Sequence, residues 1–249
     1  MVLIQVPSCI TTSGITNELC MESGNILFTA PLTLDSSKIN ECQQLVLLAR
    51  EKRLLFGDSN KEIEKWNGVN DFCQTLDNIV EIQKETKLFE GKRMLEIGFT
   101  TALPSIYALQ HGAKDITVVI PTEEALKTHI ESTFFQNNAN ERVTYIIGDV
   151  DDLTRKVGGE KFDIILAPEI VYTKQRHFEK IHNAFEFLLA SDGLILMSGR
   201  THYHNCDGNM SSMIDLIKRK NHFDIMDQTS RSHSRYETAP RKIVQIMHK

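Results

Sequence analysis

An apolar run gives way to a turn and then to a helix start within Met94-Leu95-Glu96-Ile97-Gly98-Phe99-Thr100-Thr101-Ala102-Leu103-Pro104. The run at residues 94–97 is short, apolar and interrupted by one acid, which is typical of a buried strand. Gly98 supplies the backbone freedom that a sharp turn requires, and Pro104 is tolerated in the first turn of a helix. This segment therefore predicts a strand, a tight loop and a helix in succession.

The same alternation continues to the end of the chain. Short apolar runs predict seven strands, at residues 94–97, 116–120, 143–147, 162–167, 194–198, 223–226 and 243–247. Helical spacing lies between most of them, at residues 103–111, 123–135, 177–190 and 210–220. Strands separated by helices join in parallel through right-handed crossovers, which place helices on both faces of one sheet. We expect a doubly wound, mostly parallel α/β sheet whose last two strands pair antiparallel at its edge.

The N-terminal part of the chain has a different pattern. Residues 1–35 mix short β-branched runs with Ser, Thr, Gly and Pro, which favours an irregular extension with two strands. Residues 36–50 and 71–87 show helical spacing, whereas residues 56–70 are polar and predict a loop. We therefore expect an N-terminal extension over residues 1–55 and one principal domain over residues 56–249.

The composition is that of an ordinary globular protein, with 249 residues of which 41% are hydrophobic and 24% charged. There are 33 acidic against 28 basic residues, a net charge of −5, which argues against a direct nucleic-acid partner because phosphate binding needs clustered cations. No apolar run approaches the roughly 20 residues that span a bilayer, and the first thirty residues lack the pattern of a secretory signal. We expect a soluble protein of the cytoplasm or nucleus without a membrane partner.

Cysteine and histidine usage predicts no metal site. Five cysteines form an odd set without a C-x-x-C pair, so reduced thiols are expected. His202, His204, Cys206 and Asp207 lie close together in a predicted loop, but their spacing matches no closed zinc pattern, and a chance cluster is favoured.

Four segments together resemble a known family. Residues 96–108 resemble the first motif of class I S-adenosylmethionine-dependent methyltransferases, in which an acid precedes three glycines at alternate positions. Residues 162–172 look like the fourth-strand segment of the protein-histidine methyltransferases. Residues 65–72 and 199–208 are similar to that family's tryptophan-containing segment and to the stretch after its fifth strand. The resemblance covers about residues 55 to 249, in the family's order, and implies a seven-stranded Rossmann-like fold with S-adenosylmethionine as cofactor.

The resemblance also implies a site. Glu96 would meet the methionine amino group, Asp149 the adenine amine, and Trp66 would cover the ligand. The implied cofactor-binding residues are Trp66, Glu96, Gly98, Gly148, Asp149, Ala167 and Pro168. Glu169 and Tyr172 are the implied catalytic residues, the first holding one imidazole nitrogen of the substrate and the second shaping the pocket.

By the same resemblance, the reaction is methyl transfer to a histidine nitrogen of a protein, with a large-subunit ribosomal protein as the substrate class. Histidine needs little activation, because with a pKa of about 6.5 its neutral ring already offers a lone pair at cellular pH. The main task of such an enzyme is therefore to align that nitrogen with the methyl group.

The sequence also departs from the family pattern. Thr100 and Ala102 occupy two of the three glycine positions, and by alignment Ile120 stands where an acid would accept the ribose hydroxyls. An apolar residue there leaves polar groups unmatched, at about 1 to 3 kcal/mol per group. These losses favour an alternative, a catalytically inactive member of the fold that binds another protein. A dinucleotide oxidoreductase is disfavoured, because the glycine fingerprint and the acid about 20 residues on are both missing.

Overall fold

The computed structural model describes residues 15–32, 59–139, 142–204, 206–229 and 240–249. A seven-stranded sheet in the order β5-β4-β3-β6-β7-β9-β8 forms its centre. Its strands are β3 (Arg93–Glu96), β4 (Asp115–Ile120), β5 (Val143–Ile147), β6 (Phe162–Ala167), β7 (Leu189–Arg200), β8 (Phe223–Asp227) and β9 (Arg241–His248). The strands from β5 to β7 are parallel, while β9 runs antiparallel to both β7 and β8. The predicted doubly wound sheet with an antiparallel edge is confirmed.

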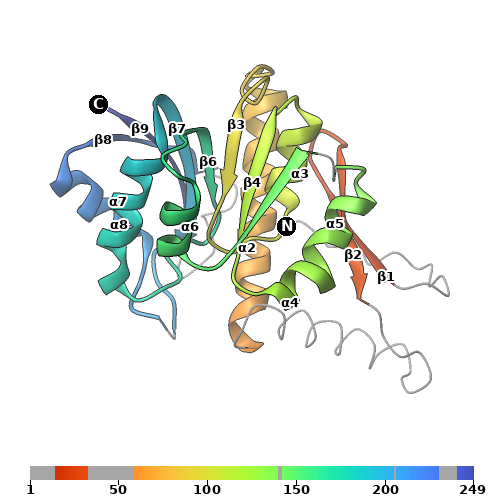
Figure 1. Cartoon of the computed structure of the whole chain (residues 1–249), viewed down its shortest axis with the longest axis horizontal. Coiled ribbons are helices and arrows are strands. Elements are labelled where there is room, and N and C mark those ends of the chain that lie inside the picture. The colour runs from red at the N-terminus through yellow and green to blue at the C-terminus, as the bar shows by residue number, and fades with distance from the viewer. Residues whose placement is uncertain (1–14, 33–58, 140–141, 205, 230–239) are drawn as a thin grey trace.

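Helices cover both faces of the sheet (Figure 1). One layer contains α2 (Ser59–Asp77), α3 (Leu103–Gln110) and α5 (Glu131–Gln136), and the other contains α6 (Val150–Lys156), α7 (Phe178–Leu188) and α8 (Met210–Lys220). Alternation along the strands supplies both cores: Met94 of β3 packs against the first layer and Leu95 against the second. Near-continuous apolar strands are the pattern expected of a parallel sheet covered on both faces.

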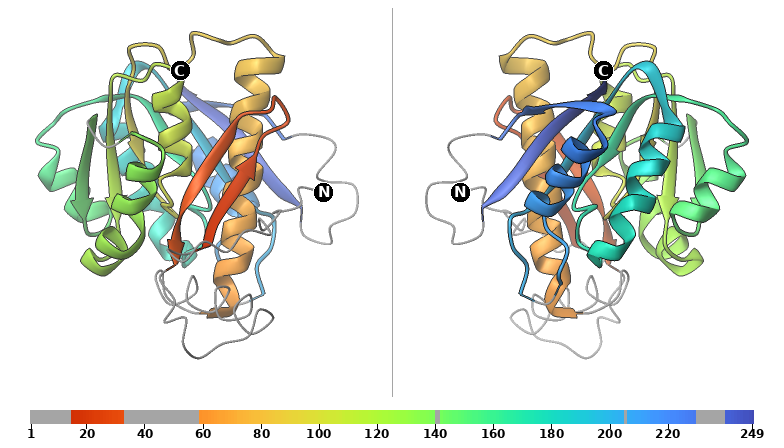
Figure 2. Two further views of the ribbon diagram at one scale, coloured as in Figure 1. Left: turned by 90° about the vertical axis from the view of Figure 1, so that its right-hand side faces the viewer. Right: turned by 90° about the vertical axis from the view of Figure 1, so that its left-hand side faces the viewer.

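A hairpin of β1 (Ile15–Cys20) and β2 (Ile26–Leu32) lies outside the first helical layer (Figures 1 and 2). Leu19 and Leu27 of the hairpin are buried in the same apolar cluster as α3 and α5. The fully buried carboxylate of Asp77 accepts hydrogen bonds from the Ser23 hydroxyl at 2.6 Å and the Tyr107 hydroxyl at 3.2 Å. These contacts hold the hairpin turn against the main body.

Several predicted elements differ from those observed. The loop prediction for residues 56–70 is wrong from Ser59 onward, because α2 begins there and buries Val69 and Phe72. The predicted helix at 71–87 ends instead in a π-helical turn, η1 (Asn78–Ile82). α6 was not predicted, and residues 123–135 are divided among α4 (Glu123–Ala125), the π-helical η2 (Leu126–Ile130) and α5. The predicted helix at 36–50 and the boundary at residue 55 lie outside the described residues, so the domain division stays a prediction.

A buried histidine makes stability sensitive to acid. His182 of α7 has no exposed surface, and its ring lies 5.4 Å from that of Phe223 and 5.7 Å from that of His222. Burial lowers the pKa of His182 below its ordinary 6.5. The unfolded chain therefore takes up a proton that the folded chain refuses, and the free energy of unfolding falls as pH drops below about 6.5.

We expect His182→Leu to remove this acid sensitivity. Between the pKa values of His182 in the folded and the unfolded chain, the buried ring changes the free energy of unfolding by at most about 1.4 kcal/mol per pH unit. Urea unfolding of the wild type, of His182→Leu and of the exposed-site control His204→Leu would be compared at neutral and mildly acidic pH. Equal losses in all three proteins would contradict the assignment.

Candidate functional site

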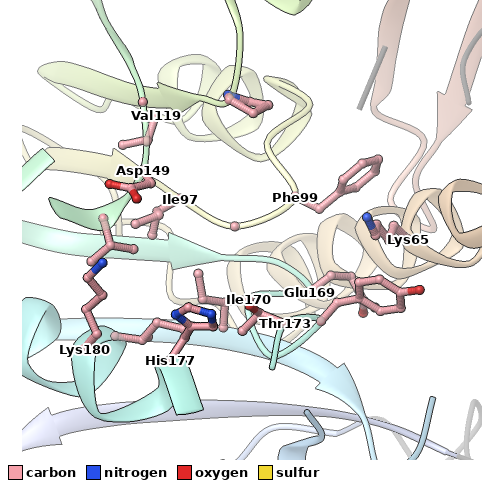
Figure 3. A pocket seen from close by; sticks show the side chains of 16 residues that line it. Lys65, Ile97, Phe99, Val119, Asp149, Glu169, Ile170, Thr173, His177 and Lys180 are labelled. Atoms are coloured by element: carbon pink, nitrogen blue, oxygen red, sulfur yellow. The ribbon is translucent and has the colours of Figure 1, made fainter. Parts of the chain in front are cut away.

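A cavity of about 370 Å³ opens beyond the carboxyl ends of β3, β4, β5 and β6. The strand order reverses here, since the chain passes from β5 at one edge to β6 on the far side of β3, and such points are where open α/β sheets bind ligands. The volume lies within the range of small-molecule sites, about 300 to 1,000 Å³. Ile97, Val119 and Ile170 supply apolar lining, and charged side chains surround them (Figure 3).

The loop after β3 approaches the cavity so closely that only glycine fits at residue 98. Gly98 has a φ of +111°, and an added Cβ would lie 2.5 Å from the carbonyl oxygen of Pro168. The next residue, Phe99, donates its backbone N–H to that same oxygen at 2.8 Å. The loops after β3 and β6 are therefore joined, and both contribute residues to the cavity lining.

Glu96 shapes the turn between β3 and α3. Its carboxylate is fully buried, with one oxygen accepting from the backbone N–H groups of Thr101 and Ala102 at 3.0 and 3.2 Å. The other oxygen accepts from the backbone N–H and the hydroxyl of Ser105 at 3.1 and 2.5 Å. Burial raises the pKa of Glu96, and these hydrogen bonds oppose the rise. Glu96 does not line the cavity.

The substitutions within the glycine motif leave the cavity open. Ala102 has a φ of +71°, so the third glycine position keeps a left-handed backbone although it carries a Cβ. Thr100 is buried and does not line the cavity. Ile120 is also buried on the opposite face of the sheet, and the residues of β4 and its loop that reach the cavity are Val119 and Pro121. Ile120, which the motif comparison aligns with the family's ribose acid, therefore does not line the cavity, because side chains alternate along a strand.

Gly148 and Asp149 line the cavity after β5, as the sequence predicts for their position. Asp149 caps α6, because its carboxylate accepts from the N–H groups of Asp151 and Asp152 at 2.8 and 3.1 Å. These backbone hydrogen bonds lower the pKa of Asp149. Gly148 has a φ of +139°, and a Cβ there would overlap the Asp152 carboxylate.

Glu169 lies at the floor of the cavity in a strained and buried conformation. Its φ is +52°, a left-handed value that costs a non-glycine residue about 1 to 3 kcal/mol and needs surrounding support. The support is a network in which the carboxylate accepts from the Tyr203 hydroxyl at 2.8 Å and from Nε of Arg241 at 2.7 Å. Arg241 also pairs with Asp71 of α2. Burial raises the pKa of Glu169, while the positive charge of Arg241 acts in the opposite direction.

The remaining predicted residues are placed as follows. Tyr172 lines the cavity, with Nζ of Lys65 at 4.4 Å from its ring centre. Ala167 and Pro168 are not part of the lining; Ala167 is buried in the second core and Pro168 contacts the β3 loop. The backbone of Trp66 lies in α2, beside Lys65, and its side chain lies outside the described residues.

Sequence reasoning missed other residues of the site. Lys65, Phe99, His177 and Lys180 line the cavity, and Arg241 stabilises Glu169 from the far end of the chain. Lys65 falls in a segment that was predicted as loop, so no helical position was assigned to it. The contact between Arg241 and Glu169 spans 72 residues of sequence, and no local pattern signals it.

Two further observations concern the described residues only. No group of three His, Cys, Asp or Glu side chains among them is arranged to hold a metal ion. No helix in the described part combines the length and apolar character that crossing a membrane demands.

Comparison with known proteins relates the chain to methyltransferases. No protein-family model matches it. An uncharacterized protein of Caenorhabditis elegans is 31% identical over 229 residues, covering 92% of each chain. A protein named histidine protein methyltransferase 1 homolog, from Dictyostelium discoideum, is 29% identical over 176 residues, 70% of this chain and 56% of that protein. A Candida glabrata protein named protein N-terminal and lysine N-methyltransferase is 27% identical over 175 residues, 62% of this chain and 68% of that protein.

Solved structures share the fold. A putative rRNA-methylase from Clostridium thermocellum superposes with a TM-score of 0.51 at 12% identity, covering 69% of this chain and 95% of that one. A putative S-adenosylmethionine dependent methyltransferase from Listeria monocytogenes gives 0.50 at 13% identity, covering 71% and 99%. At these identities the likeness shows the architecture alone.

Proposed function

Because this chain belongs to the class I S-adenosylmethionine-dependent methyltransferases and is related to protein methyltransferases, we propose that it methylates a histidine side chain of a protein. The observation that carries the proposal is the open cavity at the carboxyl ends of β3 to β6. Thr100 stands at the family's second glycine position and Ile120 is aligned with its ribose acid, and both are buried without lining that cavity.

The lining fits S-adenosylmethionine in several respects. Gly98 and Gly148 bring backbone close to the cavity without side chains, and Asp149 presents a carboxylate for the adenine amine. Ile97 and Val119 provide apolar surface between these groups. When bound, the cofactor supplies an electrophilic methyl group. The protein's part is then to exclude water and to orient the accepting nitrogen.

Glu169 and Tyr172 are the residues that would orient an imidazole. Both residues line the cavity, but the Glu169 side chain is buried and its carboxylate accepts from Arg241 and Tyr203, so it would receive an imidazole N–H only when a bound substrate opens this network. The Tyr172 ring lies against Nζ of Lys65, which also lines the cavity. The likeness to the Dictyostelium protein supports histidine as the acceptor, and a large-subunit ribosomal protein is the substrate class that the motif resemblance implies.

A second candidate function is protein binding without catalysis. It is favoured by the apolar side chains of Val119 and Pro121, which line the cavity where the family uses an acid to pair the ribose hydroxyls. Leaving these hydroxyls unpaired costs about 1 to 3 kcal/mol per group. Weak or absent cofactor binding would follow.

Calorimetric titration with S-adenosylmethionine and S-adenosylhomocysteine tests the proposal. We expect a dissociation constant at or below the order of 100 micromolar, corresponding to about 5.5 kcal/mol of binding free energy. Transfer of labelled methyl to histidine in a ribosomal protein extract, identified after hydrolysis to amino acids, would then establish the acceptor. No heat signal at millimolar cofactor would rule out catalysis and leave the protein-binding function.

Two glycine variants make the titration specific for the cavity. Gly98→Ala and Gly91→Ala both place a Cβ at positive φ, which costs about 1 to 2 kcal/mol. Only Gly98→Ala also overlaps the Pro168 carbonyl and displaces the loop, whereas Gly91 has open space. We expect Gly98→Ala to lose at least about tenfold in cofactor affinity, which is 1.4 kcal/mol, and Gly91→Ala to bind as the wild type does. Equal binding by both variants would remove the β3 loop from the site.

A further inference from the structure

The loops that follow β6 and β7 form one continuous surface beside the cavity. We call residues 170–177 together with 201–204 and 206–208 the two-loop surface. The rings of Tyr172 and Tyr203 pack edge to face at 4.7 Å, and Sγ of Cys206 donates to the carbonyl oxygen of Thr173 at 2.9 Å. Tyr172 and Thr173 also line the cavity. A partner that covers the two-loop surface therefore lies next to the cavity mouth.

The two-loop surface is cationic. Residues 170–177 contain Lys174, Arg176 and His177 and no acid, and Lys174 and Arg176 are exposed. Within the described part of the chain, neither of these two cations forms an ion pair with a carboxylate. The only acid in the second loop, Asp207, already accepts a hydrogen bond from the backbone N–H of Gln175 at 3.2 Å.

Acidic side chains and their cationic partners meet at the start of α6. Asp149, Asp151 and Asp152 gather there, beyond the end of β5. Lys180, which lines the cavity, pairs with Asp151, and Arg155 pairs with Asp152. Asp149 is the one of these three acids that lines the cavity. A net charge of −5 gives no reason for cations to collect beside the cavity, so their position needs another explanation.

We propose that the two-loop surface binds an acidic segment of the protein substrate and so presents the neighbouring side chain to the cavity. The presentation of a side chain for methyl transfer rests on the proposed function, whereas the binding of an acidic segment does not. Carboxylates on the substrate are attracted to Lys174 and Arg176 and repelled by Asp149 in the cavity lining, which fixes the direction in which the segment lies. Such exposed charge pairs are sensitive to salt.

An acidic peptide fits this surface better than RNA does. A polynucleotide gains affinity from many contacts between its phosphates and Lys or Arg side chains, and its phosphates are repelled by acidic side chains. The two-loop surface offers two exposed cations, and Asp149 lines the neighbouring cavity. A short peptide with a few carboxylates meets the cations without extending over Asp149.

Fluorescence anisotropy with labelled peptides tests the inference. One short peptide carries several glutamates, a second has glutamine at each of those positions, and a short single-stranded RNA is the third probe. The double variant Lys174→Glu/Arg176→Glu is compared with Lys84→Glu/Lys87→Glu, which changes the net charge equally but lies before β3, at the other end of that strand. New acids just before α7 are compatible with its N-terminus, so folding should be unaffected.

We expect the wild type to prefer the glutamate peptide and Lys174→Glu/Arg176→Glu to bind it at least about tenfold more weakly, with little effect of Lys84→Glu/Lys87→Glu. Equal weakening by both double variants, or equal affinity for the glutamine peptide, would overturn the inference. Tighter RNA binding that is lost in Lys174→Glu/Arg176→Glu would also overturn it and assign the surface to nucleic acid. The peptides are titrated without cofactor. If the protein binds the glutamate peptide but not S-adenosylmethionine, that result contradicts the proposed methyl transfer and leaves the peptide-binding inference standing.

Discussion

Replacing Arg241 with leucine is expected to destabilise the protein by about 3 to 5 kcal/mol, because it leaves the Glu169 carboxylate buried without a countercharge. Only 2% of the Glu169 surface is exposed, so water cannot substitute for the guanidinium. Arg241 also pairs with Asp71, and its loss would release α2 from the cavity floor. Chemical unfolding of Arg241→Leu measures the loss directly.

A matched control separates burial from charge pairing. Arg93 pairs with Glu160 at 2.7 Å, but the two side chains are 39% and 62% exposed, so Arg93→Leu is expected to cost less than about 1 kcal/mol. The double variant Arg241→Leu/Glu169→Gln removes the orphaned charge and should recover at least about half of the loss, as removal of an unpaired buried charge does elsewhere. If Arg241→Leu costs no more than Arg93→Leu, the network does not support Glu169.

The stability loss of Arg241→Leu should depend on pH. Burial already raises the pKa of Glu169, and removing Arg241 raises it further because the opposing charge is lost. Below about pH 4.5 the Glu169 carboxyl is protonated in both the folded and the unfolded chain, so the missing countercharge costs little. The free energy of unfolding of Arg241→Leu then falls as the pH rises toward and through the pKa of Glu169 in the folded chain. The deficit of Arg241→Leu relative to the wild type should therefore be smaller near pH 4.5 than at neutral pH. A deficit that grows on acidification would contradict this assignment.

The sheet could be predicted from sequence because each strand carries its own signal. The runs at 143–147 and 162–167 match β5 and β6, and in β6 apolar residues buried on both faces leave a nearly continuous pattern. The part of α2 before Asp71 was missing from the prediction because Trp66, Asn67 and Gly68 interrupt its apolar spacing. A Cβ at residue 68 would overlap the Glu169 carboxylate, which is a tertiary requirement for glycine that no local pattern contains.

The site was predictable in position but not in detail. Placing it at the strand ends follows from topology, and Gly98, Asp149, Glu169 and Tyr172 do line the cavity. Which of two adjacent residues faces the cavity depends on register, and this is why Val119 rather than Ile120 is found there. The role of Glu96 could not be predicted for a different reason. The sequence motif predicts an acid at this position but does not indicate whether its carboxylate contacts a ligand or the backbone of its own loop.

Replacing Glu96 with glutamine should be among the most damaging single-atom changes in the chain. One carboxylate oxygen faces the N–H groups of Thr101 and Ala102, and the other faces the N–H and the hydroxyl of Ser105. A glutamine keeps its carbonyl oxygen on the first side and its NH₂ on the second, where the hydroxyl can turn to accept but the Ser105 N–H loses its acceptor. Losing a hydrogen bond to a charged acceptor costs about 1.5 to 3 kcal/mol, and the remaining hydrogen bonds no longer meet a charge. The loop bearing Gly98 would lose its anchor.

Asp163→Asn is the matched control for this substitution. Asp163 lies near the amino end of β6, and its carboxylate accepts the backbone N–H of Arg93 at 2.7 Å. An asparagine keeps one carbonyl oxygen for that single donor, so a loss of about 1 kcal/mol or less is expected. Urea unfolding and cofactor titration of both variants would then show Glu96→Gln impaired in stability and binding together, and Asp163→Asn nearly unchanged in both. A stable Glu96→Gln protein that binds cofactor normally would mean that the turn after β3 is held by its backbone alone, and the four hydrogen bonds to Glu96 would have no part in forming the cavity.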